Sequence, residues 1–272
     1  MDIQIESQWH PLLSDPSESR RPKPREAGRT MVMDKGLGPN AFEDLLTTAS
    51  PYIDLIKFGF GTSPLYPLPM LREKIASAQK HGIATFPGGT LLEAAVRLDV
   101  IDAFFRSALE LGFDAVEVSD GTIAMDRRTR DALIRQAGQY GFRVFTEYGK
   151  KLSGSRISLD DLCRTAERDL LCGAEAVTVE ARESGVGVGL FDEEGNCREE
   201  ELREIVRRIP DTARLMWEAP QKEQQAHLLR TLGSDVNLGN VSPQDAFALE
   251  TLRRGLRSDT FGMHPIVADY EI

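Results

Sequence analysis

Charged residues stand within or just after several short apolar runs of this chain, such as 53–59, 114–120, 142–149 and 175–181. An ionised side chain in the protein interior is unfavourable by several kcal/mol unless it is paired or ligated. The charged residues in this pattern are Lys35, Lys57, Glu117, Glu147, Lys150, Glu180, Arg182 and Lys222. They predict either a network of salt bridges or a polar site that receives a ligand.

Carboxylates that converge from several strands are typical ligands of a hard divalent cation. Glu117, Glu147 and Glu180 supply the oxygen ligands that Mg²⁺ prefers, so a magnesium site is expected. The histidines lack metal-ligand spacing and do not favour zinc. They are His10, His81, His227 and His264. Mutual pairing of the glutamates with nearby lysine and arginine side chains stays open as an alternative.

Two glycine-containing loops indicate further functional features. Gly239 and Asn240 lead into Ser242, the expected cap of a helix, whose backbone N–H groups and dipole favour an anion. Ordinary loop chemistry accounts for the same residues equally well. Residues 184–197 are rich in glycine, which is typical of a mobile lid or of a contact between subunits.

The elements that must position these residues alternate regularly along the chain. Apolar runs that predict strands are 30–34, 53–59, 83–87, 114–120, 142–149, 175–181, 213–219 and 235–239. Amphipathic stretches that predict helices are 39–49, 69–81, 90–111, 127–140, 158–172, 199–208, 220–232 and 242–256. Thr90 with Glu93, and Ser158 with Asp161, have the spacing of capping boxes.

Strand–helix units repeated eight times predict an α/β protein, a single (β/α)8 barrel of the TIM type over residues 28–272. An open doubly wound sheet is the alternative, but no GxGxxG follows the first strand. Residues 1–27 are rich in proline, serine and charge, which is typical of a flexible N-terminal arm. In such barrels the chemistry lies at the carboxyl ends of the strands.

Composition restricts the partners. The formal net charge of −10 opposes nucleic-acid binding, which usually needs a basic face. No apolar run approaches the ~20 residues of a membrane span, and residues 1–25 lack the apolar segment of a secretory signal. A cytoplasmic protein without a membrane partner is expected. Cys163, Cys172 and Cys197 have no CxxC spacing and predict neither disulfides nor a zinc site.

Strings of residues at every strand end resemble one known family. In order along about residues 28–262 they are DKGLG, KFGFGTS, FPGGTLLE, EVSDGT, TEYGKK, VEARESG, WEAPQK and NLGNV. The ordered set is similar to the phosphosulfolactate synthase family. That family is a Mg²⁺-dependent α/β barrel that adds sulfite to phosphoenolpyruvate, for coenzyme M or sulfolactate biosynthesis, and it includes plant heat-stress-associated proteins.

The resemblance implies roles for the charged residues. Sulfite attacks C3 of phosphoenolpyruvate in a Michael-type addition, and Lys150 matches the acid that protonates C2 to give (2R)-phospho-3-sulfolactate. Lys35, Lys57 and Arg182 then neutralise the two anions. Glu147, Glu180 and Glu117 are the candidate ligands of Mg²⁺. Further candidates for anion binding are Ser184, Gly239, Asn240 and Lys222. The resemblance also implies a homo-oligomer.

Two other functions remain open from the sequence. One is a lyase or aldolase-like barrel that uses Lys57 or Lys150 as a Schiff base on another enolate-forming substrate. The other is a non-catalytic stress-associated barrel like that of the plant relatives. Retention of Lys150, Glu147 and Arg182 speaks against the non-catalytic reading, because a barrel without activity would tolerate their loss.

Overall fold

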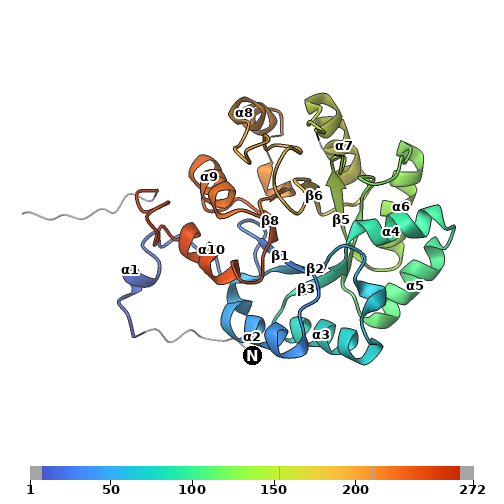
Figure 1. The fold of residues 1–272 in the computed structure, drawn as a ribbon, viewed down its shortest axis with the longest axis horizontal. Coiled ribbons are helices and arrows are strands. Elements are labelled where there is room, and N and C mark those ends of the chain that lie inside the picture. Colours follow the sequence, from blue (N-terminus) through green and yellow to red (C-terminus); the bar gives the residue numbers. More distant parts are fainter. Residues whose placement is uncertain (1–7, 153, 210, 264–272) are drawn as a thin grey trace, which may run out of the picture.

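The computed structural model describes residues 8–152, 154–209 and 211–263, so His264 and the first seven residues of the arm lie outside it. Eight parallel strands form one sheet in the order β3-β2-β1-β8-β7-β6-β5-β4 (Figure 1). The strands are β1 Thr30–Asp34, β2 Leu55–Phe58, β3 Ala84–Pro87, β4 Ala115–Val118, β5 Arg143–Tyr148, β6 Ala176–Val179, β7 Leu215–Glu218 and β8 Leu238–Val241. The expected α/β barrel is confirmed.

Helices surround the strands in Figure 1, while the short helix α1 lies apart from this ring. They are α1 Pro11–Ser14, α2 Pro39–Ala49, α3 Leu68–Lys80, α4 Gly89–Arg97, α5 Ile101–Leu111, α6 Arg127–Gln139, α7 Leu159–Cys172, α8 Glu199–Arg208, α9 Lys222–Leu232 and α10 Ala246–Arg253. Three single turns of 3₁₀ helix, Ser50–Tyr52, Ser63–Leu65 and Thr212–Arg214, complete the described elements. None of the described helices is both long and apolar enough to cross a bilayer.

The sheet closes between β3 and β4 through one aspartate. The backbone N–H of Asp114 donates to the Thr85 carbonyl at 3.1 Å. The Asp114 carboxylate accepts the Thr85 N–H at 2.9 Å. The two edge strands are therefore joined by both a main-chain and a side-chain bond at their amino ends.

Three expected elements differ from those observed. The stretch 90–111 is two helices, because Asp99 takes a left-handed conformation (φ 57°) between α4 and α5. The last strand is Leu238–Val241 rather than 235–239. The last helix begins at Ala246, so Ser242 does not cap it and instead donates its hydroxyl to Gln244 at 2.5 Å.

The expected capping boxes are also absent from α4 and α7. Neither helix has a side-chain cap bond at its amino end. A capping box does occur at α9, where Gln221 and Gln224 bond reciprocally across the first turn. The Glu93 side chain bonds elsewhere, to the segment after β4, as described below.

Inside the barrel the period-two alternation of each strand sorts side chains into two levels. The lower level is apolar and includes Met31, Leu55, Ala84, Phe86, Ala115, Phe145, Ala176 and Met216. Two residues further along β2, β4, β5 and β7 the inward side chains are charged. These side chains are Lys57, Glu117, Glu147 and Glu218, all buried. An apolar floor thus supports a charged upper level at the carboxyl ends of the strands.

The described part of the arm crosses the amino ends of the strands. The Lys23 ammonium donates to the carbonyls of Ser50, Ile53 and His81 at 3.1, 2.7 and 3.0 Å. Arg20 forms a salt bridge with Glu250 of α10 at 3.0 Å. Residues 20–25 are therefore fastened to the barrel on the face opposite the charged level.

Candidate active site

A buried lysine occupies the centre of the upper level. Lys57 Nζ lies 2.7 Å from Glu117 Oε2, 2.8 Å from Glu147 Oε2 and 3.7 Å from Glu218 Oε1. All four side chains are at most 5% exposed. Register brings them together, because each stands two residues beyond an inward apolar residue of its own strand. Lys57 thus pairs with glutamates, which the sequence left open as an alternative to a ligand site.

A second lysine lies on the outer side of this cluster. Lys151 Nζ is 3.0 Å from Glu147 Oε1, 3.5 Å from Glu180 Oε2 and 3.2 Å from Thr90 Oγ1. Its side chain is 29% exposed, so it faces both the cluster and solvent. We call Lys57, Lys151, Glu117, Glu147, Glu180 and Glu218 the glutamate ring.

The glutamate ring carries more negative than positive charge. Four carboxylates and two ammonium groups leave a formal excess of two negative charges in a buried site. Low-dielectric surroundings make such an excess unfavourable unless protons or a cation balance it. The ring therefore favours additional positive charge, as protons or a cation, beside its two lysines.

The pKa values of the ring follow from this imbalance. Burial and the carboxylates of Glu147 and Glu218 raise the pKa of Glu180 to about 11. Burial would also raise the pKa of Glu147, but Lys57 and Lys151 outweigh it and hold that pKa below its usual range. Burial lowers the pKa of Lys57, yet its three glutamate neighbours reverse this and raise it well above the ordinary value. Burial also raises the pKa values of Glu117 and Glu218, against the opposing effect of Lys57. Glu147 thus favours the ionised form most strongly, and Glu180 favours the protonated form.

Backbone N–H groups orient three of the glutamates. Gly89 N donates to Glu117 Oε2 at 2.8 Å, and Ala181 N donates to Glu218 Oε2 at 3.1 Å. Arg182 N donates to Glu180 Oε1 at 2.5 Å. Gly89 has to be glycine here, because a Cβ would lie 2.3 Å from Ser119 Oγ. The ring is thus held in place by the loops that follow β3 and β6.

Glu93 of α4 orders the loop after β4. Its buried carboxylate accepts the Ser119 hydroxyl at 2.5 Å and the backbone N–H groups of Thr122 and Ile123 at 2.7 and 2.8 Å. This loop carries Asp120, whose carboxylate holds the Lys150 ammonium at 3.0 Å. Lys150 also donates to the Asp120 carbonyl at 2.5 Å, and its side chain is 48% exposed. Lys150 lies beyond the end of β5, at the rim rather than in the ring.

Backbone strain gathers at the same end of the barrel. Phe60, Arg182 and Asn240, which lie after β2, after β6 and within β8, have φ of 55°, 62° and 54°. Non-glycine residues adopt this conformation at a free-energy cost and often do so at functional sites. Asn240 Nδ2 donates to the Arg182 carbonyl at 2.7 Å, which couples two of the strained residues. The exposed Arg182 side chain is consequently presented at the barrel mouth.

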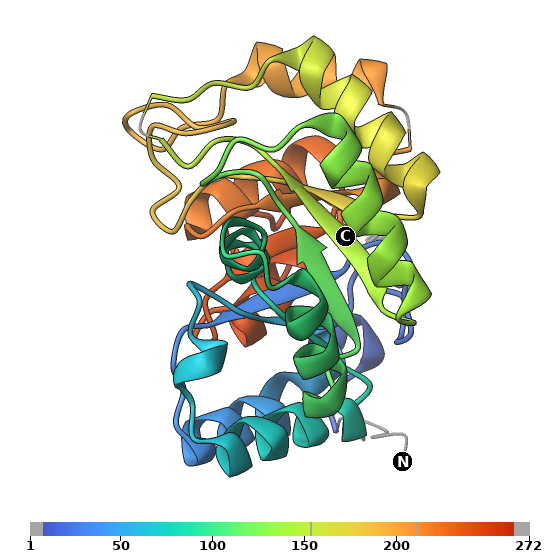
Figure 2. The same cartoon turned by 90° about the vertical axis from the view of Figure 1, so that its right-hand side faces the viewer.

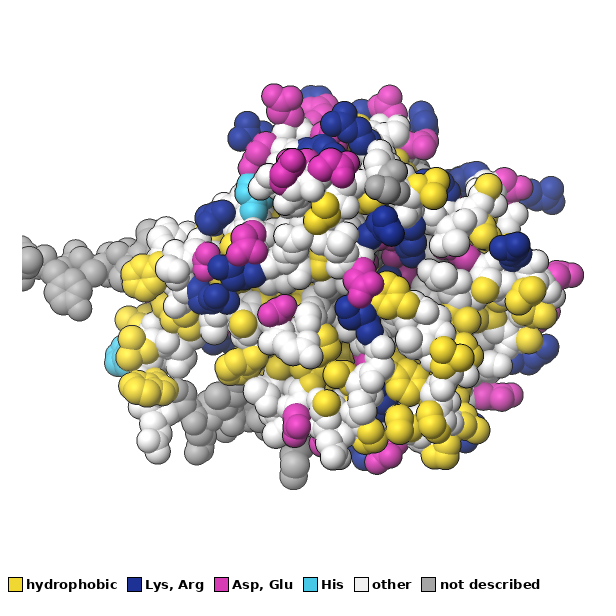
Figure 3. Space-filling view, in the orientation of Figure 1, with side chains coloured by type: hydrophobic (Ala, Val, Ile, Leu, Met, Phe, Trp, Pro, Cys, Tyr) yellow, Lys and Arg dark blue, Asp and Glu magenta, His cyan; other side chains and the backbone are white. Residues whose placement is uncertain are grey.

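The other expected anion-binding residues lie around the ring without joining it. Lys35 Nζ pairs with Glu183 at 2.6 Å and lies 5.9 Å from the Phe60 ring centroid. Lys222, the first residue of α9, pairs with Asp259 at 3.2 Å. Basic and acidic side chains adjoin one another over the middle of this face (Figure 3).

Ser184 and Gly239 have local structural partners. The Ser184 hydroxyl accepts the Val186 N–H at 3.3 Å, and its carbonyl accepts Gln221 Nε2 at 2.8 Å. Gly239 is buried in the barrel wall, where a Cβ would lie 2.7 Å from Met31 Cε. The absent side chain of Gly239 thus makes room for a methionine of the apolar floor.

The glycine-rich loop after β6 packs against the segment after β5 (Figure 2). Gly154 N donates to the Gly187 carbonyl at 2.9 Å, and Gly189 N donates to the Ser155 carbonyl at 3.0 Å. Gln224 Nε2 of α9 donates to the Gly185 carbonyl at 2.6 Å. The base of this loop is therefore fastened on two sides of the barrel mouth.

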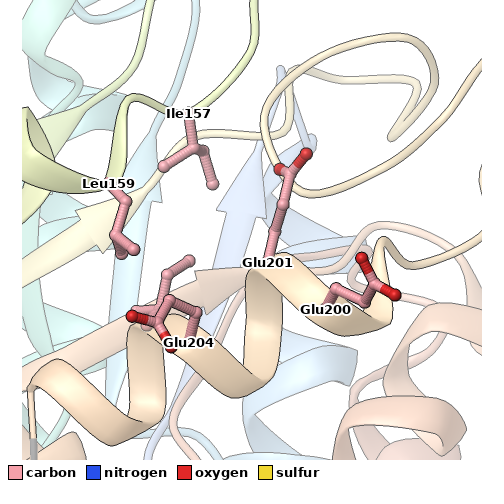
Figure 4. Close-up of a pocket in the computed structure, with 6 residues that line it drawn as sticks. Ile157, Leu159, Glu200, Glu201 and Glu204 are labelled. Carbon is pink, nitrogen blue, oxygen red and sulfur yellow. The ribbon is translucent and has the colours of Figure 1, made fainter.

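A cavity of about 320 Å³ outside the ring does not suit an anionic substrate. It lies between α8 and residues 157–159, and in Figure 4 Ile157 and Leu159 face the helix that carries three glutamates. Its lining residues are Ile157, Leu159, Glu200, Glu201, Glu204 and Ile205. Apolar walls with carboxylates and no basic side chain repel anions.

The ring offers oxygen donors to a metal ion, although lysines occupy part of the space between them. Among the described residues, no group of three or more histidine, cysteine, aspartate or glutamate side chains is arranged to hold an ion. Glu180 Oε2 is buried and accepts no hydrogen bond from the part of the chain that the structure describes. Hard carboxylate donors with surplus negative charge fit Mg²⁺ in kind.

Sequence reasoning left Lys151 and Glu218 out of the candidate residues. The period-two alternation of a strand already indicated Lys151, because residues 147, 149 and 151 belong to one face and Lys150 to the other. Glu218 likewise stands two residues beyond the inward Met216, as Glu117 does beyond Ala115. Counting every second residue onward from the apolar level identifies both Lys151 and Glu218.

Buried charges at the carboxyl ends of the strands of a (β/α)8 barrel define a barrel enzyme. Residues 18–259 match the (2R)-phospho-3-sulfolactate synthase (ComA) family, and the chain belongs to this family. It is 44% identical over 245 residues to the phosphosulfolactate synthase of Methanothermobacter thermautotrophicus, covering 89% of this chain and 95% of that protein.

A further relative supports the family assignment, and a solved structure supports the fold. The phosphosulfolactate synthase of Methanocaldococcus jannaschii is 43% identical over 239 residues, which cover 87% of this chain and 95% of that protein. The barrel is similar to the structure of 3-hexulose-6-phosphate synthase from Salmonella typhimurium, with a TM-score of 0.56 at 14% identity. That similarity covers 87% of this chain and 100% of the other, and concerns the fold alone.

Proposed function

We propose that this protein is a phosphosulfolactate synthase that adds sulfite to phosphoenolpyruvate and yields (2R)-phospho-3-sulfolactate. Membership of the family is the observation that carries the proposal. The glutamate ring supports it, because the reaction needs a place where negative charge grows on one carboxylate while a proton is delivered nearby. The Lys57 and Lys151 ammonium groups lie at the same strand ends.

The bond changes are simple. The lone pair of the sulfite sulfur forms the bond to C3 of phosphoenolpyruvate, and the C2–C3 π electrons move toward the substrate carboxylate. A proton then adds at C2, and no bond to phosphate breaks. The protein has to hold two anions together against their repulsion and supply that proton.

Cationic side chains at the barrel mouth suit the first task. Lys35 and Arg182 belong to the loops after β1 and β6, and Lys222 is the first residue of α9, which follows β7; each is at least partly exposed. Lys35 and Lys222 make exposed ion pairs with Glu183 and Asp259, which contribute little and exchange readily for a bound anion. We propose that these three residues bind the phosphate and sulfite groups.

Lys151 suits the second task. Its ammonium is the outermost of the ring and 29% exposed, so it can face a substrate that enters from the mouth. Burial lowers the pKa of Lys151, but Glu147 and Glu180 outweigh it and keep this lysine protonated. We propose Lys151 as the donor of the C2 proton. Lys150, held by Asp120 at the rim, stays the alternative donor and is compared with it below.

Glu147 and Glu180, with Glu117 behind them, are the proposed ligands of Mg²⁺. When bound, this ion supplies a Lewis acid that stabilises the developing charge on the substrate carboxylate. The surplus negative charge of the ring supports this assignment, as does Glu180 Oε2, which accepts no hydrogen bond from the described residues and has the Lys151 ammonium at 3.5 Å. The homo-oligomer and the cytoplasmic location expected from the sequence are carried forward as parts of the proposal.

The competing lyase or aldolase-like mechanism has less support. A Schiff base needs a neutral amine, whereas the glutamates around Lys57 raise its pKa well above the ordinary value even though burial lowers it. Borohydride treatment with substrate present is therefore expected to leave Lys57 unmodified.

The deciding assay incubates purified protein with phosphoenolpyruvate, sulfite and Mg²⁺ and follows the ³¹P spectrum. Conversion of the vinyl phosphate signal to an alkyl phosphate signal, dependent on sulfite, supports the proposal. Omission of sulfite is the control for hydrolysis, and EDTA tests the metal. No sulfite-dependent loss of phosphoenolpyruvate would refute it.

A further inference from the structure

A second charged site lies on the opposite face of the barrel. An open cavity of about 980 Å³ is lined by arm residues 20–25, the turn Ser50–Tyr52, residues 79–82 and Arg254. These segments precede β1, β2 and β3 or follow α10, so the cavity is at the amino ends of the strands. We call it the basal cavity. Its volume falls in the upper part of the range of small-molecule sites, about 300–1,000 Å³.

The lining of the basal cavity is strongly basic. Its six cationic side chains are Arg20, Arg21, Lys23, Arg25, Lys80 and Arg254. Within the described ranges no aspartate or glutamate lines it. On a chain of formal net charge −10 this composition is the reverse of the average surface. The cavity therefore selects for negative charge.

Nearby carboxylates neutralise only part of this charge. Glu250 is shared by Arg20 and Arg254, at 3.0 and 2.8 Å. Asp54 pairs with Arg25 at 3.4 Å, and the exposed Asp235 lies 3.7 Å from Arg21.

Lys80 is exposed and has no salt-bridge partner in the part of the chain that the structure describes. Three carboxylates thus face six cations, which leaves three positive charges in excess.

Mutual repulsion among these cations agrees with that excess. Burial and, to a smaller extent, the positive charge of Arg25 lower the pKa of Lys23 to about 8, against the opposing effect of Asp54. Burial also lowers the pKa of Arg25; Asp54 and Glu250 oppose this effect, while Arg20 and Arg254 act in the same direction as burial. A bound anion would relieve this repulsion.

We propose that the basal cavity binds a small soluble anion with two phosphate groups, separate from the substrates of the glutamate ring. Arginine guanidinium groups match phosphate oxygens in geometry as well as charge. An excess of three positive charges matches a diphosphate better than a single carboxylate. The volume leaves room for an organic group beside the phosphates, as in a nucleoside diphosphate.

Isothermal titration of the full chain with inorganic pyrophosphate, at constant ionic strength, tests the proposal. We expect saturable binding that is at least tenfold weaker in the double variant Arg21→Ala/Lys80→Ala. Both residues are exposed, so their removal is expected to leave the fold intact. Arg128→Ala/Arg203→Ala, which removes two exposed arginines from α6 and α8, is the charge-matched control and is expected to change binding less than twofold.

Two further experiments test where pyrophosphate binds and whether the natural ligand is a nucleotide or an inorganic anion. Lys151→Ala is expected to retain pyrophosphate binding, because Lys151 belongs to the glutamate ring. Competition by ADP but not adenosine indicates a nucleotide source, and lack of competition by ADP indicates an inorganic one. Absence of saturable binding, or loss of binding in Lys151→Ala but not in Arg21→Ala/Lys80→Ala, would overturn the proposal. None of these readouts depends on turnover of phosphoenolpyruvate.

Discussion

Glu147 connects the two lysines of the glutamate ring, Lys57 and Lys151. Its Oε2 lies 2.8 Å from the buried Lys57 Nζ, while its Oε1 lies 3.0 Å from Lys151 Nζ at the mouth. One carboxylate therefore couples an ammonium that solvent cannot reach to one that a substrate can. The predictions below follow from this division between an inner and an outer cation.

The two adjacent lysines after β5 are expected to differ in their contribution to catalysis. Lys151→Ala should lower kcat of the sulfite addition by about 10²-fold or more, which is the usual contribution of a general acid. Lys150→Ala should lower kcat by less than about tenfold, because its ammonium is bonded to Asp120 at the rim. Steady-state kinetics of the two variants give the comparison. A larger kcat effect at Lys150 would assign the proton to that residue instead.

Removal of the inner cation is expected to destabilise the fold. Lys57→Met leaves Glu117, Glu147 and Glu218 without their shared partner, which should lower the free energy of unfolding by about 3–5 kcal/mol. Urea denaturation measures the change. The double variant Lys57→Met/Glu117→Gln should recover part of the loss, since it removes one of the unpaired charges. A single variant as stable as wild type would show that the ring does not need Lys57.

Stability of the metal-free protein is expected to fall as pH rises. Burial and neighbouring carboxylates raise the folded-state pKa of Glu180 to about 11, whereas an unfolded glutamate titrates near its ordinary value. Between those values the folded state keeps a proton that the unfolded state has lost. The free energy of unfolding of the wild type, measured relative to that of Glu180→Gln, should therefore decrease by up to about 1.4 kcal/mol per pH unit as the pH rises.

The measurement compares urea unfolding of wild type and Glu180→Gln in EDTA at pH 6, 7 and 8. Titrating groups outside the ring are common to both proteins, so the difference reports Glu180 together with the ring carboxylates coupled to it. A difference that is constant with pH would contradict the raised pKa. Added Mg²⁺ should flatten the wild-type slope if the ion takes the place of the proton.

Asn240 is expected to act by positioning Arg182. Asn240→Gly keeps the left-handed backbone (φ 54°) but loses the bond to the Arg182 carbonyl, so KM for phosphoenolpyruvate should rise more than kcat falls. Asn240→Ala also strains the backbone and should be about 1 kcal/mol less stable than Asn240→Gly. Kinetics and denaturation of the two variants separate the bond from the strain. Equal KM values in wild type and Asn240→Gly would exclude the positioning role.

The amino-acid sequence by itself determined the alternation of strands and helices and therefore the barrel. Local periodicity is set by neighbouring residues, which is why α2, α6 and α8 begin at the expected residues. The residue strings that resemble the phosphosulfolactate synthase family can also be recognised in the sequence alone. Boundaries that depend on distant contacts were less predictable, such as the later start of β8 and the break at Asp99 between α4 and α5.

Only the tertiary structure decided which charges meet. Closure of the barrel brings Lys57 of β2 against Glu117 and Glu147 of β4 and β5, although 60 and 90 residues separate them along the chain. It also directs Lys151 inward and leaves Lys150 with Asp120. The basal cavity has the same origin, because its basic residues come from segments that only the fold unites. Buried charge needs a partner in space, and the partner's position is a property of the closed barrel rather than of any local pattern.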